Sequence, residues 1–111
     1  MKSFLEQLGE PGTCRFGTWV KLSTLETLET LALVGFDFVV VDMEHAPHTF
    51  ETAYRCIVQA QGLGMKALVR LPDDRGTYVQ RILDSGADGV LIPRVRHAED
   101  ARAIIDGMRF S

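Results

Sequence analysis

Strand-like and helix-like segments alternate four times along this chain, and this alternation limits the possible folds more than any other feature. Short connections between such segments favour right-handed βαβ crossovers, which build a parallel sheet. The expected strands are residues 15–22, 36–41, 65–71 and 87–95, and the expected helices are residues 23–34, 49–61, 75–83 and 98–108. The sequence therefore predicts an α/β fold with a parallel sheet.

The clearest boundaries surround the first two helices. Ser23 has Glu26 three residues after it, the spacing of a capping box, and Gly35 suits the left-handed residue that ends many helices. Thr49 is expected to begin the second helix. Between the two helices, residues 36–41 form a nearly continuous apolar and β-branched run, which is typical of a strand covered on both faces.

Length and composition narrow the class of protein. With 111 residues, of which 46% are hydrophobic, the chain can bury one core, so we expect one domain. The net charge of -3, without a basic cluster, argues against nucleic acid as a partner. We find no signal peptide and no apolar run of the roughly 18 to 20 residues that a membrane helix needs, so we expect a cytoplasmic protein. Cys14 and Cys56 match no disulfide or zinc pattern and are expected to be free thiols.

Ionisable residues gather at the expected carboxyl ends of the strands. Asp42, Glu44 and His45 follow the second strand, and Arg70 lies at the end of the third. Two folds are consistent with the alternation of strands and helices: an open doubly wound sheet and part of a (β/α)8 barrel. Both folds place ligands beyond the carboxyl ends of the strands, so these residues form the candidate site in either one.

The residue types at this edge suit a small keto acid. Asp42 and His45 are three residues apart, and a carboxylate that holds one imidazole nitrogen leaves the other free as a general base. Arg70 offers a planar guanidinium for a substrate carboxylate. A structural interpretation stays open, because ion pairs and turn caps also gather at strand ends. In that interpretation, Asp42 caps a turn and Arg70 pairs with one of the acids.

Four fragments in unbroken order resemble the HpcH/HpaI aldolase family. They are GTWVKL at residues 17–22, GFDFVVVDMEHAPH at 35–48, ALVRLP at 67–72 and ILDSGADGVLIPRV at 82–95. The family comprises metal-dependent class II pyruvate aldolases related to 2-keto-3-deoxy sugar acid aldolases. The resemblance therefore implies a lyase with small-molecule substrates, which joins pyruvate to an aldehyde or separates the two.

The resemblance also implies roles for individual residues. His45 would move the proton at the aldol hydroxyl as general base or acid, with Asp42 orienting it. Arg70 would hold the pyruvate carboxylate and stabilise the enolate oxygen, with Glu44 orienting it. Trp19 would line the pocket, and a core aromatic residue is the alternative at that position.

Asp84 is a further candidate. It lies at the carboxyl end of the expected third helix, where the helix dipole disfavours a negative charge. The resemblance implies that this aspartate approaches the histidine of a neighbouring subunit, so that the site depends on a homo-oligomer. A solvated surface aspartate is the alternative, and both interpretations stay open.

The family fold needs about 250 residues, and this chain supplies four βα units. We therefore expect the first four units of a (β/α)8 TIM barrel, a half barrel in one domain of residues 1–111, with the C-terminal half absent. Family members hold a divalent cation (Mg, Mn or Co) through a Glu and an Asp of the later half, so we expect no metal ligand in this chain. Exposed edges and an apolar face predict a fragment, a half that pairs with another chain, or a flattened sheet that dimerises.

The leading functional hypothesis is a lyase that cleaves or forms 2-keto-4-hydroxy acids, with little or no activity in this chain alone. One alternative is a non-catalytic half barrel that serves assembly or binding. Another is a related acyl-CoA lyase, although the DMEHAPH stretch at residues 42–48 favours the sugar-acid branch. Purely structural roles are expected for His48, His97, Met43, Met65 and Cys56.

Overall fold

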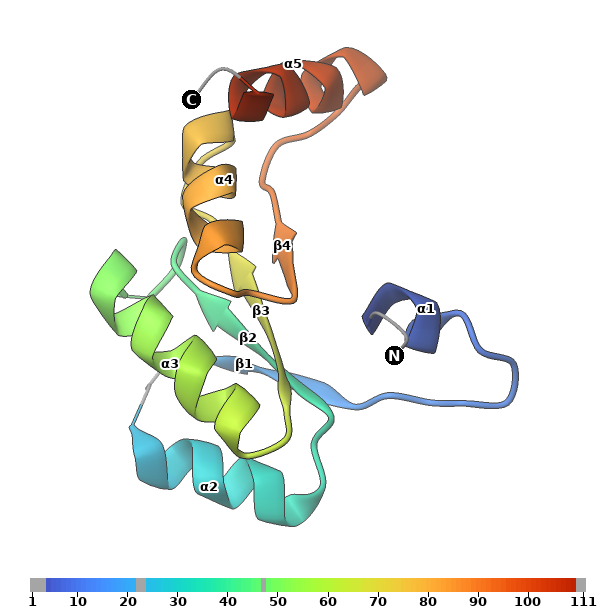
Figure 1. Ribbon diagram of the computed structural model, residues 1–111, viewed down its shortest axis with the longest axis vertical. Helices are drawn as coiled ribbons and strands as arrows, with labels where there is room; N and C mark the ends of the chain where they lie inside the picture. The colour runs from blue at the N-terminus through green and yellow to red at the C-terminus, as the bar shows by residue number, and fades with distance from the viewer. Residues whose placement is uncertain (1–3, 22–23, 47, 110–111) are drawn as a thin grey trace.

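The structure is a computed structural model that describes residues 4–21, 24–46 and 48–109 (Figure 1). Its elements in chain order are α1 (Phe4–Leu8), β1 (Gly17–Val20), α2 (Leu25–Val34), β2 (Phe38–Asp42), α3 (Phe50–Gly62), β3 (Lys66–Arg70), α4 (Gly76–Asp84), β4 (Gly89–Leu91) and α5 (Ala98–Arg109). The predicted alternation of strands and helices is confirmed. No helix in the described ranges is both long and apolar enough to cross a bilayer.

The four strands form one parallel sheet in the order β1-β2-β3-β4. The α/β fold with a parallel sheet is therefore confirmed. Each new strand pairs with the one before it, so the described strands contain no reversal of order of the kind that defines a doubly wound sheet. The register sets Asp42 beside Arg70, and this pairing places the ends of β2 and β3 at the same edge.

One face of the sheet, here called the helix-covered face, carries the core. Val39, Val41, Ala67 and Val69 point to this face and are fully buried. Helix α3 covers them with four buried residues, Ala53, Cys56, Ile57 and Ala60. Burial raises the pKa of the Cys56 thiol to about 11, which suits a structural residue. Met43 and Met65 are also buried, as predicted.

The opposite face, here called the open face, is much less covered. Its side chains line a hollow of about 320 Å³, whose walls are formed by Gly17, Thr18, Trp19, Phe38, Val40, Leu68 and Leu91. Helix α1 lies on this side of the sheet (Figure 1), where the Phe4 and Phe38 rings meet edge to face at 5.3 Å. A Cβ at Gly17 would overlap the Phe38 ring, so any larger residue at this position would force that ring to move.

The helix boundaries follow local capping. Thr24 caps α2 by accepting a hydrogen bond from the Thr27 N–H, whereas the predicted cap, Ser23, lies outside the described residues. Gly35 ends α2 with φ 107°, as predicted. Thr49 caps α3, also as predicted, and forms a reciprocal capping box with Thr52.

Two elements differ from the sequence-based expectation. Helix α1 was not predicted, because it is short and its Phe4 is buried through the tertiary contact with Phe38. Strand β4 covers Gly89–Leu91 rather than residues 87–95. It pairs with β3 on one side, and Pro93 cannot donate a ladder hydrogen bond further along the chain.

Candidate active site

Asp42 and Arg70 form a two-point ion pair at the carboxyl edge of the sheet. Arg70 Nε donates to Asp42 Oδ1 at 3.2 Å, and Arg70 Nη2 donates to Oδ2 at 2.5 Å. The two residues are register partners on adjacent strands, and both side chains leave the sheet on the open face. This parallel arrangement of donors and acceptors is the strong, geometrically specific form of an arginine–carboxylate contact.

Asp42 is fully buried and also organises the chain that follows it. Its Oδ1 atom accepts the backbone N–H groups of Glu44 and His45, both at 2.9 Å. The hydrogen bond from Arg70, helped by these two backbone donors, holds the pKa of Asp42 well below its usual value, although burial acts in the opposite direction. Asp42 is therefore a fixed anion that shapes the turn after β2.

Arg70 is clamped on a second side by Trp19. Its Cζ atom lies 4.1 Å from the centre of the Trp19 ring, which β1 presents from the open face. The hydrogen bond that Arg70 donates to Asp42 raises the pKa of Arg70, so the guanidinium stays charged. The Arg70 side chain is 25% exposed, and its Nη1 atom has no hydrogen-bond partner in the described part of the chain. A fixed cation with a free donor thus faces the open side of the sheet.

Glu44 connects Arg70 to His45. Glu44 Oε1 lies 3.7 Å from Arg70 Nε and 3.6 Å from His45 Nε2. These distances exceed direct hydrogen bonds, so Glu44 acts on both groups through charge. The imidazole of His45 is mostly exposed, which leaves it accessible to a ligand.

The carboxylate contacts match the expectation only in part. Glu44 does pair with Arg70, at 3.7 Å, but Asp42 also binds Arg70 and accepts only the backbone N–H of His45. The reason is the pleat of the sheet, because register partners on adjacent strands meet on the same face. The His45 ring projects from the turn beyond the strand and reaches Glu44 instead. The structural interpretation of the sequence predicted both the pairing of Arg70 with an acid and the cap that Asp42 forms on the turn.

His48 stabilises the turn that follows β2 through a contact with the backbone of Asp42. Its Nδ1 atom lies 2.8 Å from the Asp42 backbone carbonyl, a contact in which the ring donates. A structural role was expected for His48, and the structure places it in the loop before α3, which Thr49 caps. His97 directly precedes α5, and its backbone N–H donates to Asp100 Oδ2.

Asp84 does not join this cluster within the chain. It is the last residue of α4, is exposed, and accepts a 2.7 Å hydrogen bond from Gln80 Nε2. Helix α4 connects the end of β3 to the start of β4 (Figure 1), and no hydrogen bond or ion pair joins Asp84 to His45 within the described residues. A contact between Asp84 and a histidine of another subunit stays a prediction.

Sequence reasoning missed Arg94, which follows β4. Its Nη1 atom lies 4.0 Å from Glu44 Oε2, and its backbone has φ 61°. The sequence signal was available in the Pro93-Arg94 pair, because a turn with proline in the first central position often needs positive φ in the second. Glycine or asparagine usually fills that second position.

The acidic residues of this cluster do not form a metal site. In residues 4–21, 24–46 and 48–109, no three His, Cys, Asp or Glu side chains come together in a way that could hold an ion. The Asp42 carboxylate is occupied by Arg70 and two N–H groups, and Glu44 faces cationic neighbours. The described residues therefore do not fit the cation that the family resemblance implies.

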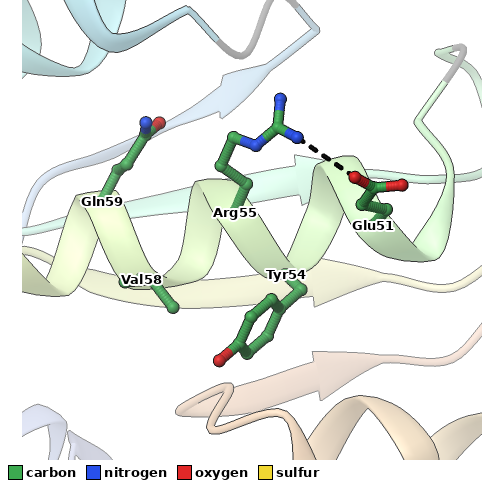
Figure 2. A pocket seen from close by; sticks show the side chains of 5 residues that line it. All are labelled: Glu51, Tyr54, Arg55, Val58 and Gln59. Carbon is green, nitrogen blue, oxygen red and sulfur yellow. Dashed lines mark hydrogen bonds and ion pairs between the residues drawn. The ribbon is translucent and has the colours of Figure 1, made fainter.

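A second hollow of about 540 Å³ lies on the outer surface of α3 (Figure 2). Its lining residues are Glu51, Tyr54, Arg55, Val58 and Gln59, and a 3.2 Å ion pair joins Arg55 to Glu51. All five come from one helix, so the hollow lacks the convergent polar groups of a ligand site. The carboxyl edge of the sheet remains the better candidate.

Comparisons with known proteins find aldolases among the similar sequences. The 2-dehydro-3,6-dideoxy-6-sulfogluconate aldolase of Pseudomonas putida is 34% identical over 94 residues, which cover 85% of this chain and 37% of that protein. The 2-keto-3-deoxy-L-rhamnonate aldolase of Salmonella gallinarum is 32% identical over 107 residues, or 96% of this chain and 40% of that protein. This chain thus spans about two fifths of the length of these relatives.

The fold comparison gives the same result. The crystal structure of the HpcH/HpaI aldolase from Desulfitobacterium hafniense DCB-2 superposes with a TM-score of 0.81 and 34% sequence identity, covering 93% of this chain and 40% of that one. The family model described as HpcH/HpaI aldolase/citrate lyase matches residues 15–110. The chain belongs to the HpcH/HpaI aldolase/citrate lyase family.

Proposed function

We propose that this chain carries the carboxylate clamp and the acid–base histidine of a lyase that cleaves 2-keto-4-hydroxy acids into pyruvate and an aldehyde. The observation that supports this most directly is the state of Arg70. Asp42 and Trp19 fix its guanidinium, part of it stays exposed with a free Nη1 donor, and His45 lies across Glu44 from it. The names of the related aldolases point to keto-deoxy sugar acids as the substrate class.

In the proposed reaction, Arg70 binds the substrate carboxylate and so places the keto group near its own charge. His45 accepts the proton of the C4 hydroxyl, the C3–C4 bond breaks, and the aldehyde leaves. The electron pair of that bond moves to the C2 oxygen as an enolate, which the Arg70 charge stabilises. The proton that His45 took then passes to the enolate carbon, which gives pyruvate and restores the neutral imidazole. The metal of the family enters no step here, because the described residues do not hold it.

We further propose that the four βα units are half of a (β/α)8 barrel, a single partial domain whose open face is the inward one. The hollow of about 320 Å³ on that face and the unreversed strand order support this arrangement. Trp19 and Arg70 would then point into the barrel, where the rest of the wall comes from another stretch of polypeptide. The 111-residue chain by itself should have little aldolase activity.

Asp84 enters this proposal through assembly. In the described part of the chain, its carboxylate accepts a hydrogen bond from Gln80 and makes no hydrogen bond or ion pair with His45. We propose a homo-oligomer in which Asp84 contacts the His45 of another copy. An Asp84→Asn variant should then lower activity in the assembled protein while its helix stays intact, because the amide can still accept the bond from Gln80.

Pyruvate binding tests the clamp directly. Trp19 is the only tryptophan of the chain and stacks on Arg70, so its fluorescence reports on the site. Saturable quenching by pyruvate is expected for the wild-type chain and for Arg55→Ala, a matched loss of an exposed arginine on α3. Arg70→Ala should abolish it. Equal binding by wild-type and Arg70→Ala chains would contradict the proposal.

The role of His45 needs a chemical readout. In the assembled protein, exchange of the pyruvate methyl protons with deuterated water, followed by NMR in the presence of Mg, Mn or Co, reports enolate formation and reprotonation. His45→Ala should slow the exchange by about a hundredfold or more, the usual scale of lost acid–base catalysis. His97→Ala, which removes an exposed histidine from the start of α5, is the control.

A further inference from the structure

Arg94 stands out because its backbone conformation is unfavourable for its type. Among the described residues, it is the only one other than glycine with positive φ, at 61°. Residues other than glycine rarely adopt a positive φ, because the Cβ atom then crowds the backbone. Such a strained backbone persists where the surrounding structure or a function requires it. The preceding Pro93 suits a turn in which glycine is the usual next residue. An arginine at this point therefore needs a reason.

The side chain of Arg94 turns toward the candidate site rather than away from it. Its Nη1 atom lies 4.0 Å from Glu44 Oε2, while the other oxygen of Glu44 faces His45 and Arg70. Arg94 also lies near enough to Asp73 to lower the pKa of that carboxyl, although Arg75 contributes most of this effect. The guanidinium thus stands among the loops that follow β2, β3 and β4.

Arg94 also has unused donors. Its contact with Glu44 is longer than a hydrogen bond, and in the described part of the chain its side chain donates no hydrogen bond. The side chain is 58% exposed, in contrast to 25% for Arg70. Arg70 is therefore held in place at the strand ends, whereas Arg94 is more exposed and less constrained and lies on the other side of Glu44.

We propose that Arg94 is a specificity-determining residue that binds an oxyanion at the far end of the substrate, on the aldehyde-derived part. This inference rests on the proposed function, because Arg70 must hold the keto-acid end. The planar guanidinium of arginine suits carboxylate and phosphate oxyanions alike. The favoured substrates are thus 2-keto acids with a second negative group, and Glu44 spaces the two cations that receive the two ends.

Matched ligand pairs test the proposal without requiring turnover. The first pair is 2-oxoadipate and 2-oxohexanoate, which differ by a terminal carboxylate. The second is 2-keto-3-deoxy-6-phosphogluconate and 2-keto-3-deoxygluconate, which differ by a phosphate. Dissociation constants are measured through Trp19 fluorescence on the 111-residue chain. We expect the charged member to bind about tenfold more tightly in at least one pair, as a charge-assisted contact predicts, and the pair that responds identifies the oxyanion.

Substitutions at Arg94 and at the neighbouring Arg96 test whether Arg94 causes the preference for the charged ligand. Arg94→Met should reduce the preference at least fivefold, and Arg96→Met, which removes an exposed arginine of the same loop, should change it less than twofold. Arg94→Gly should also lose the preference while melting at an equal or higher temperature, because glycine suits the positive φ. A markedly lower melting temperature for Arg94→Gly would instead reveal a structural role.

The outcomes separate this inference from the proposed function. Binding of both members with no preference, or a preference that survives in Arg94→Met, would overturn the role of Arg94 and leave the clamp intact. Absence of binding by pyruvate and by all four probes would overturn both proposals.

Discussion

The two edges of the sheet use the same residue type in different ways. At the amino edge, Asp37 accepts the Phe16 N–H at 2.8 Å, and Asp88 accepts the Ala67 N–H at 2.8 Å and a bond from Gln61 Nε2. Both acids follow a G-x pair, in GFD and GAD, and both tie one strand to the neighbouring chain segment. At the carboxyl edge, Asp42 also accepts backbone N–H groups, but it additionally holds a partly exposed cation, Arg70, through two direct hydrogen bonds.

This difference shows what distinguishes a structural carboxylate from one that supports a site. The amino-edge acids bind neutral backbone and amide groups, and the one ion pair found for them in the described residues, between Asp37 and Arg15, is long at 3.9 Å. The contacts of Asp42 continue through Arg70 to Trp19 and, by way of Glu44, to His45. Burial of a charge is costly unless it is paired, and here the pairing partner keeps one donor free for a ligand.

Removal of Asp42 should have the largest effect. Asp42→Ala leaves the Arg70 charge and two N–H groups without their acceptor, and the loss of one partner of a buried pair costs about 3–5 kcal/mol. Urea unfolding followed by circular dichroism measures this change. Asp84→Ala, the loss of an exposed acid, should stay within about 0.5 kcal/mol. Similar losses in the two variants would remove the distinction between Asp42 and an ordinary surface acid.

Acidification should reproduce part of that loss. The folded-state pKa of Asp42 lies below its unfolded value of about 3.9, so its contribution to stability is fully present above that pH. The contribution falls as the pH drops from about 4 toward the folded-state pKa. The free energy of unfolding, measured in urea from pH 7 to pH 3, should decline more steeply for the wild type than for Asp42→Asn. Parallel curves for the two proteins would contradict the buried ion pair.

An amino-edge substitution should weaken the fold without touching the site. Asp88→Ala removes the acceptor of the Ala67 N–H and should cost about 1–3 kcal/mol. Pyruvate quenching of Trp19, measured well below the melting temperature, should keep the wild-type dissociation constant. A folded Asp88→Ala chain that no longer binds pyruvate would mean that the two edges are not separate in function.

Replacement of Trp19, whose ring stacks on Arg70, should change the free energy of unfolding least. Trp19→Leu should cost about 0.5–1 kcal/mol, because a half-exposed cation–π contact contributes little. Trp19→Phe keeps an aromatic face and should recover part of that loss. Chemical unfolding followed by circular dichroism is the measurement, since the fluorescence reporter is absent in both variants. A loss above about 2 kcal/mol would show that Trp19 belongs to the core of the fold rather than to the site.

Local sequence signals predicted the frame of the molecule. The β-branched run before Asp42, the cap at Thr49 and the terminating Gly35 each depend on neighbouring residues, and the structure confirms all three. The shared position of Asp42 and Arg70 also followed, because consecutive parallel strands end at one edge. These inferences required no knowledge of side-chain partners.

The features that the sequence did not predict depend on tertiary contacts. The pairing of Asp42 with Arg70, rather than with the His45 ring, depends on which β2 and β3 residues share a register, and the sequence does not state it. The bond between His48 and the Asp42 carbonyl depends on the path of the turn. Helix α1 depends on Phe38, far away in sequence. Arg94 had a local signal in Pro93, but its contact with Glu44 had none.

The unreversed strand order also bears on how the chain folds. Gly17 pairs with Phe38, Phe38 with Lys66, and Leu68 with Gly89, so each strand needs only its predecessor as a template. These pairings join residues 21 to 28 positions apart, and a reversed strand order would require longer loops, which cost more entropy to close. During synthesis, each βα unit can therefore dock as it leaves the ribosome, without waiting for later segments. The nascent polypeptide would align Asp42 with Arg70 as soon as the third strand emerges.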